Sequence, residues 1–260
     1  MNLDKSAKFL CDRIPEKPIC TIILGSGLGQ ITEKLENKII FPYKNIPYYP
    51  SSSVSGHKGE WVFGYINEKP ILCASGRFHY YEKYSIEEIA SPIFITDQLK
   101  CKNVIITNSA GCLNTDWNLG DFMFIEGYLD YTFQNNYLDK DIVYFSNIAK
   151  YYEKLNVYVK NIGIDLRKGV YTWTLGPNYE TSAEIQDIIK LGGSAVGMSS
   201  VPEMMKAYNL GITPIGISCL TNYGAGLQND ILTHNAVLDI SQKANDKFHD
   251  LIQIIIQNIL

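Results

Sequence analysis

Six short segments of this 260-residue chain combine polar side chains with glycines in ways that could bind a small anion or a heterocycle. The first, GSGLG at residues 25–29, follows the apolar run TIIL. Its glycines permit a turn so tight that successive N–H groups face one anion, and the Ser26 hydroxyl adds a donor. Gln30 stands where a dinucleotide fingerprint needs glycine, and the GK[ST] of a P-loop does not follow. The segment predicts an anion site or a plain turn.

The second segment, SGRFHYYE at residues 75–82, carries a guanidinium, an imidazole and a phenol at alternate positions. In an extended chain Arg77, His79 and Tyr81 would project to one side. Arginine offers a rigid fork of donors that suits phosphate beside a hydroxylated ligand. The alternative is an exposed strand face with an ion pair to Glu82.

Two further segments place small residues after apolar runs. In TNSAG at 107–111, the small residues allow close approach of the backbone to a ligand, or equally a simple turn. In VGMSSVPE at 196–203, Met198 and the Ser199 hydroxyl could line a sugar and an anion, or Met198 could fill the core.

The segment GPNYET at 176–181 joins a predicted strand to a predicted helix. Tyr179 could stack on an aromatic ring, and Glu180 could accept that ring's N–H groups. Glu180 could instead be a favourable acid at the start of a helix.

The last segment, LTNYG at 220–224, precedes a long amphipathic stretch. The Asn222 amide offers a donor and an acceptor on one fork, which suits the edge of a heterocycle. His234 lies near the start of that stretch, where a histidine is often only a surface or helix-end residue.

Hydrophobic patterning predicts the elements that hold these segments. Strands are expected in CTIILG, PILCASG, NVIITNSAG, GVYTWTLG, SAVGMS and TPIGISCLTN. Helices are expected at 86–100, at 181–191, and over a C-terminal stretch whose apolar face holds Val237, Ile240, Ala244, Phe248, Leu251 and Ile255. Nearly continuous apolar strands alternating with helices predict an α/β fold, one domain over residues 1–260 with a central mixed, largely parallel sheet flanked by helices. In such sheets ligands collect beyond the carboxyl ends of the strands, where the six segments fall.

Composition narrows the functional classes. A hydrophobic content of 46% supports one large core, and a formal net charge of −4 provides no general attraction to nucleic acid or anionic membranes. The first twenty residues lack the apolar core of a secretory signal, and no run is long enough to span a bilayer. The six cysteines have no metal-ligand spacing. We therefore expect a cytoplasmic protein with reduced, mostly buried thiols and no metal site.

Taken together, the segments resemble the trimeric class of purine nucleoside phosphorylases, which are related to the methylthioadenosine phosphorylases. The resemblance runs from about Cys20 to Val237 and keeps the family's order of motifs: GSGLG, SVSGHKG at 53–59, GRFHYYE, TNSAG, GPNYET, AVGMSSVPE and LTN. It implies the nucleoside phosphorylase fold, a homotrimer, and cleavage of purine nucleosides by inorganic phosphate as co-substrate, without a metal or organic cofactor.

The resemblance also implies roles for individual residues. Phosphate would be held by Ser26, Arg77, His79, Ser109, Ala110 and Ser199, with His57 beside the anion. Ribose would contact Tyr81, Met198 and His234, the last at the 5′-hydroxyl. The base would lie against Ala110, Gly111, Tyr179, Glu180, Val196, Gly197 and Asn222. Of these, His57, His79, Glu180 and Asn222 are the expected catalytic groups.

Two of these positions bear on the choice of base. A Glu180 carboxylate would accept the N1–H of a 6-oxopurine, whereas adenine presents a bare acceptor there. In the related methylthioadenosine phosphorylases the position of Asn222 is aspartate. The expected substrates are therefore inosine- and guanosine-like nucleosides, with ribose or deoxyribose, and the products are free base and (deoxy)ribose 1-phosphate.

The chain departs from the family pattern at three places. Lys83 and Cys112 stand where the family usually has glycine. Residues 131–150 do not follow the pattern, in which this region supplies an aromatic side chain from a neighbouring subunit to cover the sugar; Tyr144 and Phe145 are the candidates here.

Two other functions compete with phosphorolysis: hydrolysis of a nucleoside on a similar fold, and binding of a nucleoside without turnover. The combination of Arg77, His79 and Ser26 favours phosphorolysis. A hydrolase needs no anion clamp and would need a carboxylate to activate water.

Overall fold

The computed structural model of the protein describes residues 2–51, 58–134, 141–146, 148–228 and 233–260, with the side chains of His234 and Asn235 outside the description. Its strands are β1 Cys20–Leu24, β2 Glu36–Pro42, β3 Glu60–Ile66, β4 Lys69–Ser75, β5 Asn103–Cys112, β6 Phe122–Asp130, β7 Val143–Tyr144, β8 Leu166–Trp173, β9 Ala195–Gly197 and β10 Thr213–Tyr223. Its helices are α1 Leu3–Cys11, α2 Ile86–Ile89, α3 Ser91–Gln98, α4 Ala149–Lys160, α5 Ser182–Lys190, α6 Val201–Asn209, α7 His234–Lys243 and α8 Asn245–Ile254. Short 3₁₀ turns cover Gly29–Lys34, Tyr43–Asn45 and Tyr80–Glu82, and a π-helical turn covers Ile255–Ile259.

The strands form one mixed sheet in the order β10-β6-β8-β9-β5-β1-β4-β3-β2, with β7 paired to β6. Parallel pairs join β1 to β4 and β5, β5 to β10, and β8 to β6 and β9. The other pairs are antiparallel and include the β2–β3–β4 meander at one end of the sheet. The expected α/β class with a mixed sheet between helices is confirmed.

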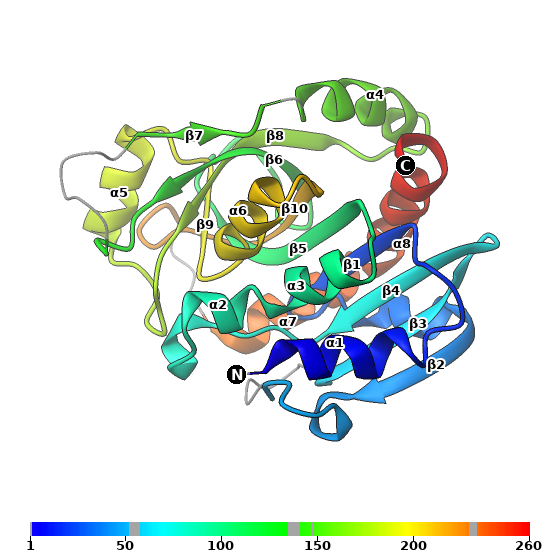
Figure 1. Ribbon diagram of the computed structural model, residues 1–260. Coiled ribbons are helices and arrows are strands. Elements are labelled where there is room, and N and C mark those ends of the chain that lie inside the picture. Colours follow the sequence, from blue (N-terminus) through cyan, green and yellow to red (C-terminus); the bar gives the residue numbers. More distant parts are fainter. Residues whose placement is uncertain (1, 52–57, 135–140, 147, 229–232) are drawn as a thin grey trace.

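The sheet closes on itself at one end. Strand β5 pairs with β9 and, along almost its whole length, with β10, while β10 also pairs with β6. Strands β5, β10, β6, β8 and β9 therefore form a ring, with β1, β4, β3 and β2 continuing outward from β5 (Figure 1). This closure draws the ends of β5, β9 and β10 together, which an open sheet would not do.

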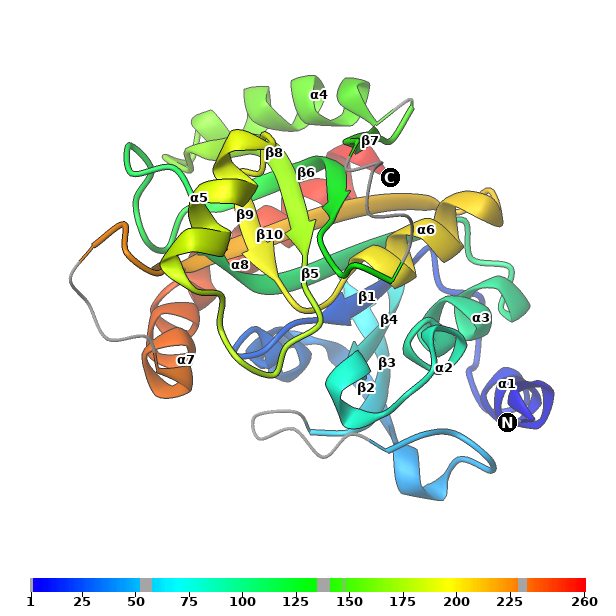
Figure 2. The same ribbon diagram turned by 90° about the vertical axis from the view of Figure 1, so that its left-hand side faces the viewer.

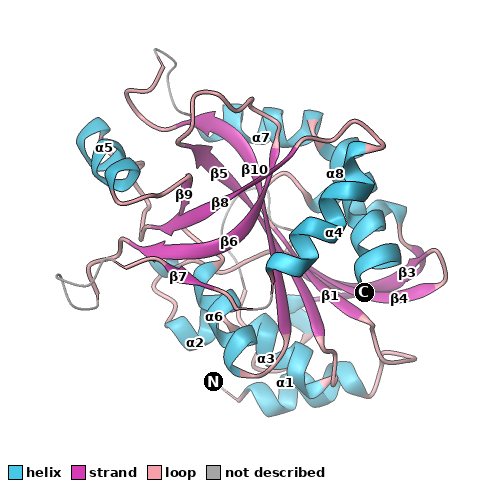
Figure 3. Ribbon diagram, turned by 90° about the horizontal axis from the view of Figure 1, so that it is seen from above, coloured by secondary structure: helices cyan, strands magenta, loops and turns pink. Residues whose placement is uncertain are grey.

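Helices cover the sheet in two groups. Helices α1, α2, α3 and α6 pack against one another on one side, and α4, α7 and α8 gather on the other (Figures 2 and 3). Helix α5 lies apart from both groups, beside the ends of β8 and β9. Because both faces are covered, β1, β5 and β10 are buried almost throughout, which explains their nearly continuous apolar sequences.

All six predicted strands are present, as β1, β4, β5, β8, β9 and β10. The predicted helix at 86–100 is divided at Ala90, because Pro92 begins a new helix, α3, where its missing N–H costs nothing. The long C-terminal helix is likewise divided at Ala244. The Asn245 amide lies within hydrogen-bond distance of the carbonyl oxygens of Gln242, at 3.3 Å, and of Gly27, at 3.2 Å, so the break ties the C-terminal helices to the loop after β1.

The six cysteines all lie in the described part of the chain, where none forms a disulfide and only Cys11 is exposed. Burial raises the pKa of the other five thiols, which keeps them protonated at neutral pH. Within the described residues, no helix is both long and apolar enough to span a membrane.

Candidate active site

An open cavity of about 780 Å³ lies beyond the carboxyl ends of β1, β4, β8 and β9, beside the last residues of β5 and β10. Its walls include thirteen residues singled out in the sequence: Ser26, Arg77, His79, Tyr81, Ser109, Gly111, Tyr179, Glu180, Val196, Gly197, Met198, Ser199 and Asn222. Gly25, Asn108, Thr221 and Gly224, which belong to the segments GSGLG, TNSAG and LTNYG, also line it, as does Val237, which was expected only on the apolar face of a helix.

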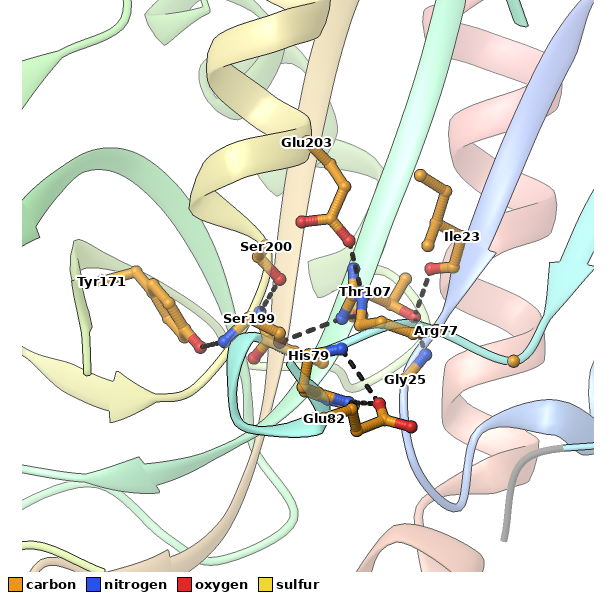
Figure 4. A network of polar contacts seen from close by, with 12 residues as sticks. Ile23, Gly25, Arg77, His79, Glu82, Thr107, Tyr171, Ser199, Ser200 and Glu203 are labelled. Carbon is orange, nitrogen blue, oxygen red and sulfur yellow. Dashed lines mark hydrogen bonds and ion pairs between the residues drawn. The ribbon is translucent and has the colours of Figure 1, made fainter. Parts of the chain in front are cut away.

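The guanidinium of Arg77 is held in the cavity wall by a buried ion pair. Its Nε donates to Glu203 Oε1 at 2.8 Å, and its Nη1 donates to the carbonyl of Thr107 at 2.7 Å and to Ser199 Oγ at 3.1 Å (Figure 4). The side chains of Arg77 and Glu203 are only 2% and 0% exposed. The alternative interpretation of residues 75–82, an exposed strand face with an ion pair to Glu82, is therefore wrong for Arg77. Glu203 was not expected as a functional residue.

Ser199 is presented by a strained turn at the start of α6. Ser200 has φ 69° and ψ −43°, and the N–H of Val201 donates to the carbonyl of Ser199 at 2.8 Å, which makes a γ-turn of the rare type. The Asn108 amide donates to Ser200 Oγ at 2.8 Å, and the Ser199 N–H donates to the Tyr171 hydroxyl at 3.3 Å (Figure 4). These two bonds hold the turn, and with it the Ser199 hydroxyl, against the cavity.

His79 is fixed by an acid three residues later. Glu82 Oε1 accepts from the His79 backbone N–H at 3.0 Å and lies 3.1 Å from its Nδ1, within one short 3₁₀ turn. The ring of Tyr81 stacks on that of His79 with centroids 4.8 Å apart. Lys83 ends the turn with φ 69°, the left-handed region that glycine favours, so this lysine keeps the backbone conformation expected of the family's glycine.

The loop after β1 differs in detail from the anion-binding turn predicted for it. The N–H of Gly25 donates to Thr107 Oγ1 at 3.0 Å, and that of Leu28 donates back to the Gly25 carbonyl at 3.1 Å. These two N–H groups therefore bind protein oxygens and do not face a common anion. The tight fit explains Gly25 itself, because a Cβ there would lie 2.6 Å from the Asn108 Cα.

Two further wall residues lie on different elements: Asn222 on β10 and Glu180 in the loop before α5. Thr174 Oγ1 donates to Glu180 Oε1 at 2.7 Å. Burial raises the pKa of Glu180, and this hydrogen bond opposes the rise. Asn222 accepts from Thr221 Oγ1 at 3.1 Å through Oδ1, and its Nδ2 donates to the Tyr223 carbonyl at 3.1 Å, which leaves one of its two amide N–H bonds for a further acceptor.

Gly176 packs against Met198 and Tyr81, the two candidate ribose contacts on the cavity wall. Its φ is +68°, and a Cβ on it would lie 2.4 Å from Met198 Sδ and 3.0 Å from Tyr81 Cδ1. A larger residue would displace both side chains. Burial raises the pKa of the Tyr81 phenol to about 12, so it carries its proton at neutral pH and can donate or accept a hydrogen bond.

Three predicted site residues and the two candidate aromatic residues are not placed at the cavity. Ala110 is buried inside β5 and does not line it; its neighbours Ser109 and Gly111 do. His57 and the side chain of His234 lie outside the described residues. Phe145 packs on Tyr128 and Tyr208 of its own chain and is only 6% exposed, whereas Tyr144 is 59% exposed, so of these two only Tyr144 offers its ring to another subunit.

The sequence profile described as the phosphorylase superfamily matches residues 20–257. This match covers every element that lines the cavity. The chain therefore belongs to the phosphorylase superfamily.

Comparison with individual proteins narrows this assignment. The chain is 36% identical to purine nucleoside phosphorylase 1 of Geobacillus stearothermophilus over 266 residues, which cover 99% of this chain and 97% of that protein. A crystal structure of Schistosoma purine nucleoside phosphorylase in complex with hypoxanthine superimposes with a TM-score of 0.86 at 29% identity, covering 100% of this chain and 97% of that one. The Schistosoma mansoni enzyme in complex with adenosine gives the same values. Within its superfamily the chain is a member of the purine nucleoside phosphorylases, which are pentosyltransferases.

The buried ion pair generates a prediction about stability. We expect Glu203→Ala to lower the free energy of unfolding by about 3–5 kcal/mol, because it leaves the Arg77 charge buried without its carboxylate. Urea denaturation of the purified variant measures this loss.

A double variant provides the control. Arg77→Met with Glu203→Leu removes both charges and should recover most of the stability. Glu33→Ala removes an exposed partner of Lys58 and should cost less than about 1 kcal/mol. A loss for Glu203→Ala no greater than that of Glu33→Ala would contradict the assignment of a structural ion pair.

Proposed function

We propose that the protein cleaves 6-oxopurine nucleosides, such as inosine and guanosine, by phosphorolysis at this cavity. The observation that carries the proposal is that the wall of one cavity holds both an arginine-centred group of donors and the Glu180 carboxylate with the Asn222 amide. In the proposed reaction inorganic phosphate is a co-substrate, and no metal or organic cofactor takes part.

Phosphate would bind among Arg77, His79, Ser26 and Ser199 on the cavity wall. These side chains supply donors from a guanidinium, an imidazole and two hydroxyls, which is the chemistry that an oxyanion requires. The pairing of Arg77 with Glu203 and of His79 with Glu82 supports this role, because groups held in place lose little freedom when the anion binds.

In the reaction, a phosphate oxygen forms a bond to C1′ as the bond from C1′ to N9 of the purine breaks. The bonding electron pair passes to the purine, and the phosphate proton ends on the released base. The sugar becomes positively charged on the way, so a bound dianion beneath it stabilises the transition state. An Asn222 N–H directed at N7 would stabilise the negative charge that develops on the leaving purine.

At the base end, Glu180 would select the 6-oxopurine. As a carboxylate it accepts the N1–H of hypoxanthine or guanine, whereas N1 of adenine is itself an acceptor and would leave the pair of acceptors unbonded at a cost of about 2 kcal/mol. A solved structure of a relative contains adenosine. Turnover of both inosine and adenosine is therefore the relevant measurement.

The deciding experiment follows purine release from inosine and from adenosine, each with and without phosphate. We expect hypoxanthine together with ribose 1-phosphate, only when phosphate is present, and a kcat/KM for adenosine at least tenfold lower. Free ribose without phosphate would establish a hydrolase, and tight nucleoside binding without turnover would establish a binding protein. Equal kcat/KM for the two nucleosides would contradict the proposed specificity while leaving phosphorolysis intact.

Asn222→Asp tests the base end separately. The exchange keeps the size of the side chain but replaces an amide donor by a second acceptor, so the preference should shift from inosine toward adenosine by tenfold or more in the ratio of kcat/KM values. The matched control is Asn118→Asp on a surface turn outside the cavity lining. An unaltered ratio in Asn222→Asp would remove Asn222 from the base pocket.

A homotrimer is also part of the proposal. Its support from the structure is the set of exposed apolar side chains that includes Ile86, Val143, Tyr144 and Met205, three of which lie on elements around one groove between β7 and α6. We expect light scattering to give a mass of about three chains of 29.4 kDa each. A mass of one chain at micromolar concentration would rule the trimer out.

A further inference from the structure

Thr174 does not line the cavity, but it hydrogen-bonds two residues that do, Glu180 and Gly197. It follows β8 directly, is 7% exposed, and is not part of the cavity wall. Its hydroxyl lies 2.7 Å from Glu180 Oε1 and 3.4 Å from the Gly197 carbonyl. A threonine hydroxyl has one proton, so it donates to the nearer, charged oxygen of Glu180.

The backbone of Thr174 is fixed independently of this bond. Its N–H donates to the Gly197 carbonyl at 3.0 Å, which continues the pairing of β8 with β9. The hydroxyl therefore projects from a rigid strand end, and the carboxylate that it holds belongs to the loop before α5, whose helix starts only at Ser182. A loop side chain acquires a defined orientation when a strand residue binds it.

We propose that Thr174 is a positioning residue for base selection: its hydroxyl holds Oε1 of Glu180 so that Oε2 accepts the N1–H of the purine. This inference rests on the proposed function, because it assigns Glu180 to the base. Thr174 does not touch the substrate and is not a catalytic residue.

Two physical effects give Thr174 this role. A hydrogen bond to a charged group is worth more than one between neutral groups, so losing it changes binding by about tenfold to a hundredfold. The bond also favours the ionised form of Glu180, in opposition to burial, which raises the pKa of that carboxyl. Without the hydroxyl the pKa rises further, and a larger fraction of Glu180 is protonated and unable to accept the N1–H at mildly acidic pH.

The charged groups around Glu180 are few among the described residues. Glu184, on the first turn of α5, is the charged residue whose field acts on the Glu180 pKa, and it raises that pKa less than burial does. Glu184 itself accepts from the Thr181 N–H at 2.7 Å and the Thr181 hydroxyl at 2.8 Å in the helix cap. Removal of the Thr174 hydroxyl leaves this cap unchanged, so its effect on the pKa is separable from that of Glu184.

The test compares Thr174→Val with Thr172→Val. Both exchanges replace a hydroxyl by a methyl group of similar size, but the Thr172 hydroxyl, two residues earlier and also buried, has no hydrogen-bond partner among the described residues. We expect Thr174→Val to raise the KM for inosine tenfold or more with a smaller change in kcat, and to move the acidic limb of the kcat/KM profile to higher pH. Thr172→Val should match the unmodified protein, and Thr174→Ser, which keeps the hydroxyl, should restore both values.

A third variant distinguishes failure of this inference from failure of the proposed function. Glu180→Gln should abolish the preference for inosine over adenosine. If it does so while Thr174→Val behaves like Thr172→Val, Thr174 has no positioning role and the inference is wrong. If Glu180→Gln leaves the preference for inosine over adenosine unchanged, Glu180 does not select the base. Both the proposed specificity and the inference about Thr174 are then wrong. Thr174→Ala, assayed in the same way, replaces Thr174→Val if the valine variant does not fold.

Discussion

The buried pair of Arg77 and Glu203 is the interaction on which the site depends. An isolated charge at this depth would be strongly destabilising, and each of these side chains makes the burial of the other tolerable. The pair also joins three parts of the chain, because Arg77 binds the Thr107 carbonyl of β5 and Ser199 ahead of α6. The rest of the cavity wall therefore surrounds a guanidinium, that of Arg77, whose position is fixed by its hydrogen bonds.

Closure of the sheet into a ring explains how segments from both halves of the sequence reach that cation. The pairing of β5 with β10 brings the small residues 107–111 beside Asn222, and the pairing of β5 with β9 brings Val196 opposite Gly111. The fit at this junction is tight, since a Cβ on Gly111 would lie 3.1 Å from Val196 Cγ1 and 3.2 Å from Asn222 Nδ2. The ring thus brings wall residues from β5, β9 and β10 together on paired strands.

Local patterns in the sequence were sufficient to predict six of the strands and most of the cavity wall, but not the ring strand β6 or the meander strand β3. Apolar runs rich in β-branched residues mark β1, β5 and β10, and the polar segments that follow strands lie at their carboxyl ends. The edge strand β2 was missed because its apolar run, Ile39 to Phe41, has only three residues, fewer than the roughly four or more that indicate a buried strand.

What the sequence could not supply were pairings between distant residues. Nothing local to β5 indicates that β10, over a hundred residues later, will complete a ring with it. Glu203 was overlooked because an acid in the first turn of a helix is normally exposed, and only the position of Arg77 explains its burial. Thr174 gave no signal because a hydroxyl within TWTLG is ordinary for a strand; its acceptor, Glu180, is the residue that the pattern did reveal.

Ring closure has a consequence for how the protein is made. Ile105 on β5 pairs with Ile215 on β10, so one edge of β5 has no partner until the ribosome has added more than a hundred further residues. A nascent chain carrying only the first half of the sequence exposes an apolar strand edge of the kind that pairs with other chains. Folding of the ring must await the C-terminal third of the polypeptide, and long-range contacts of this kind make folding slow.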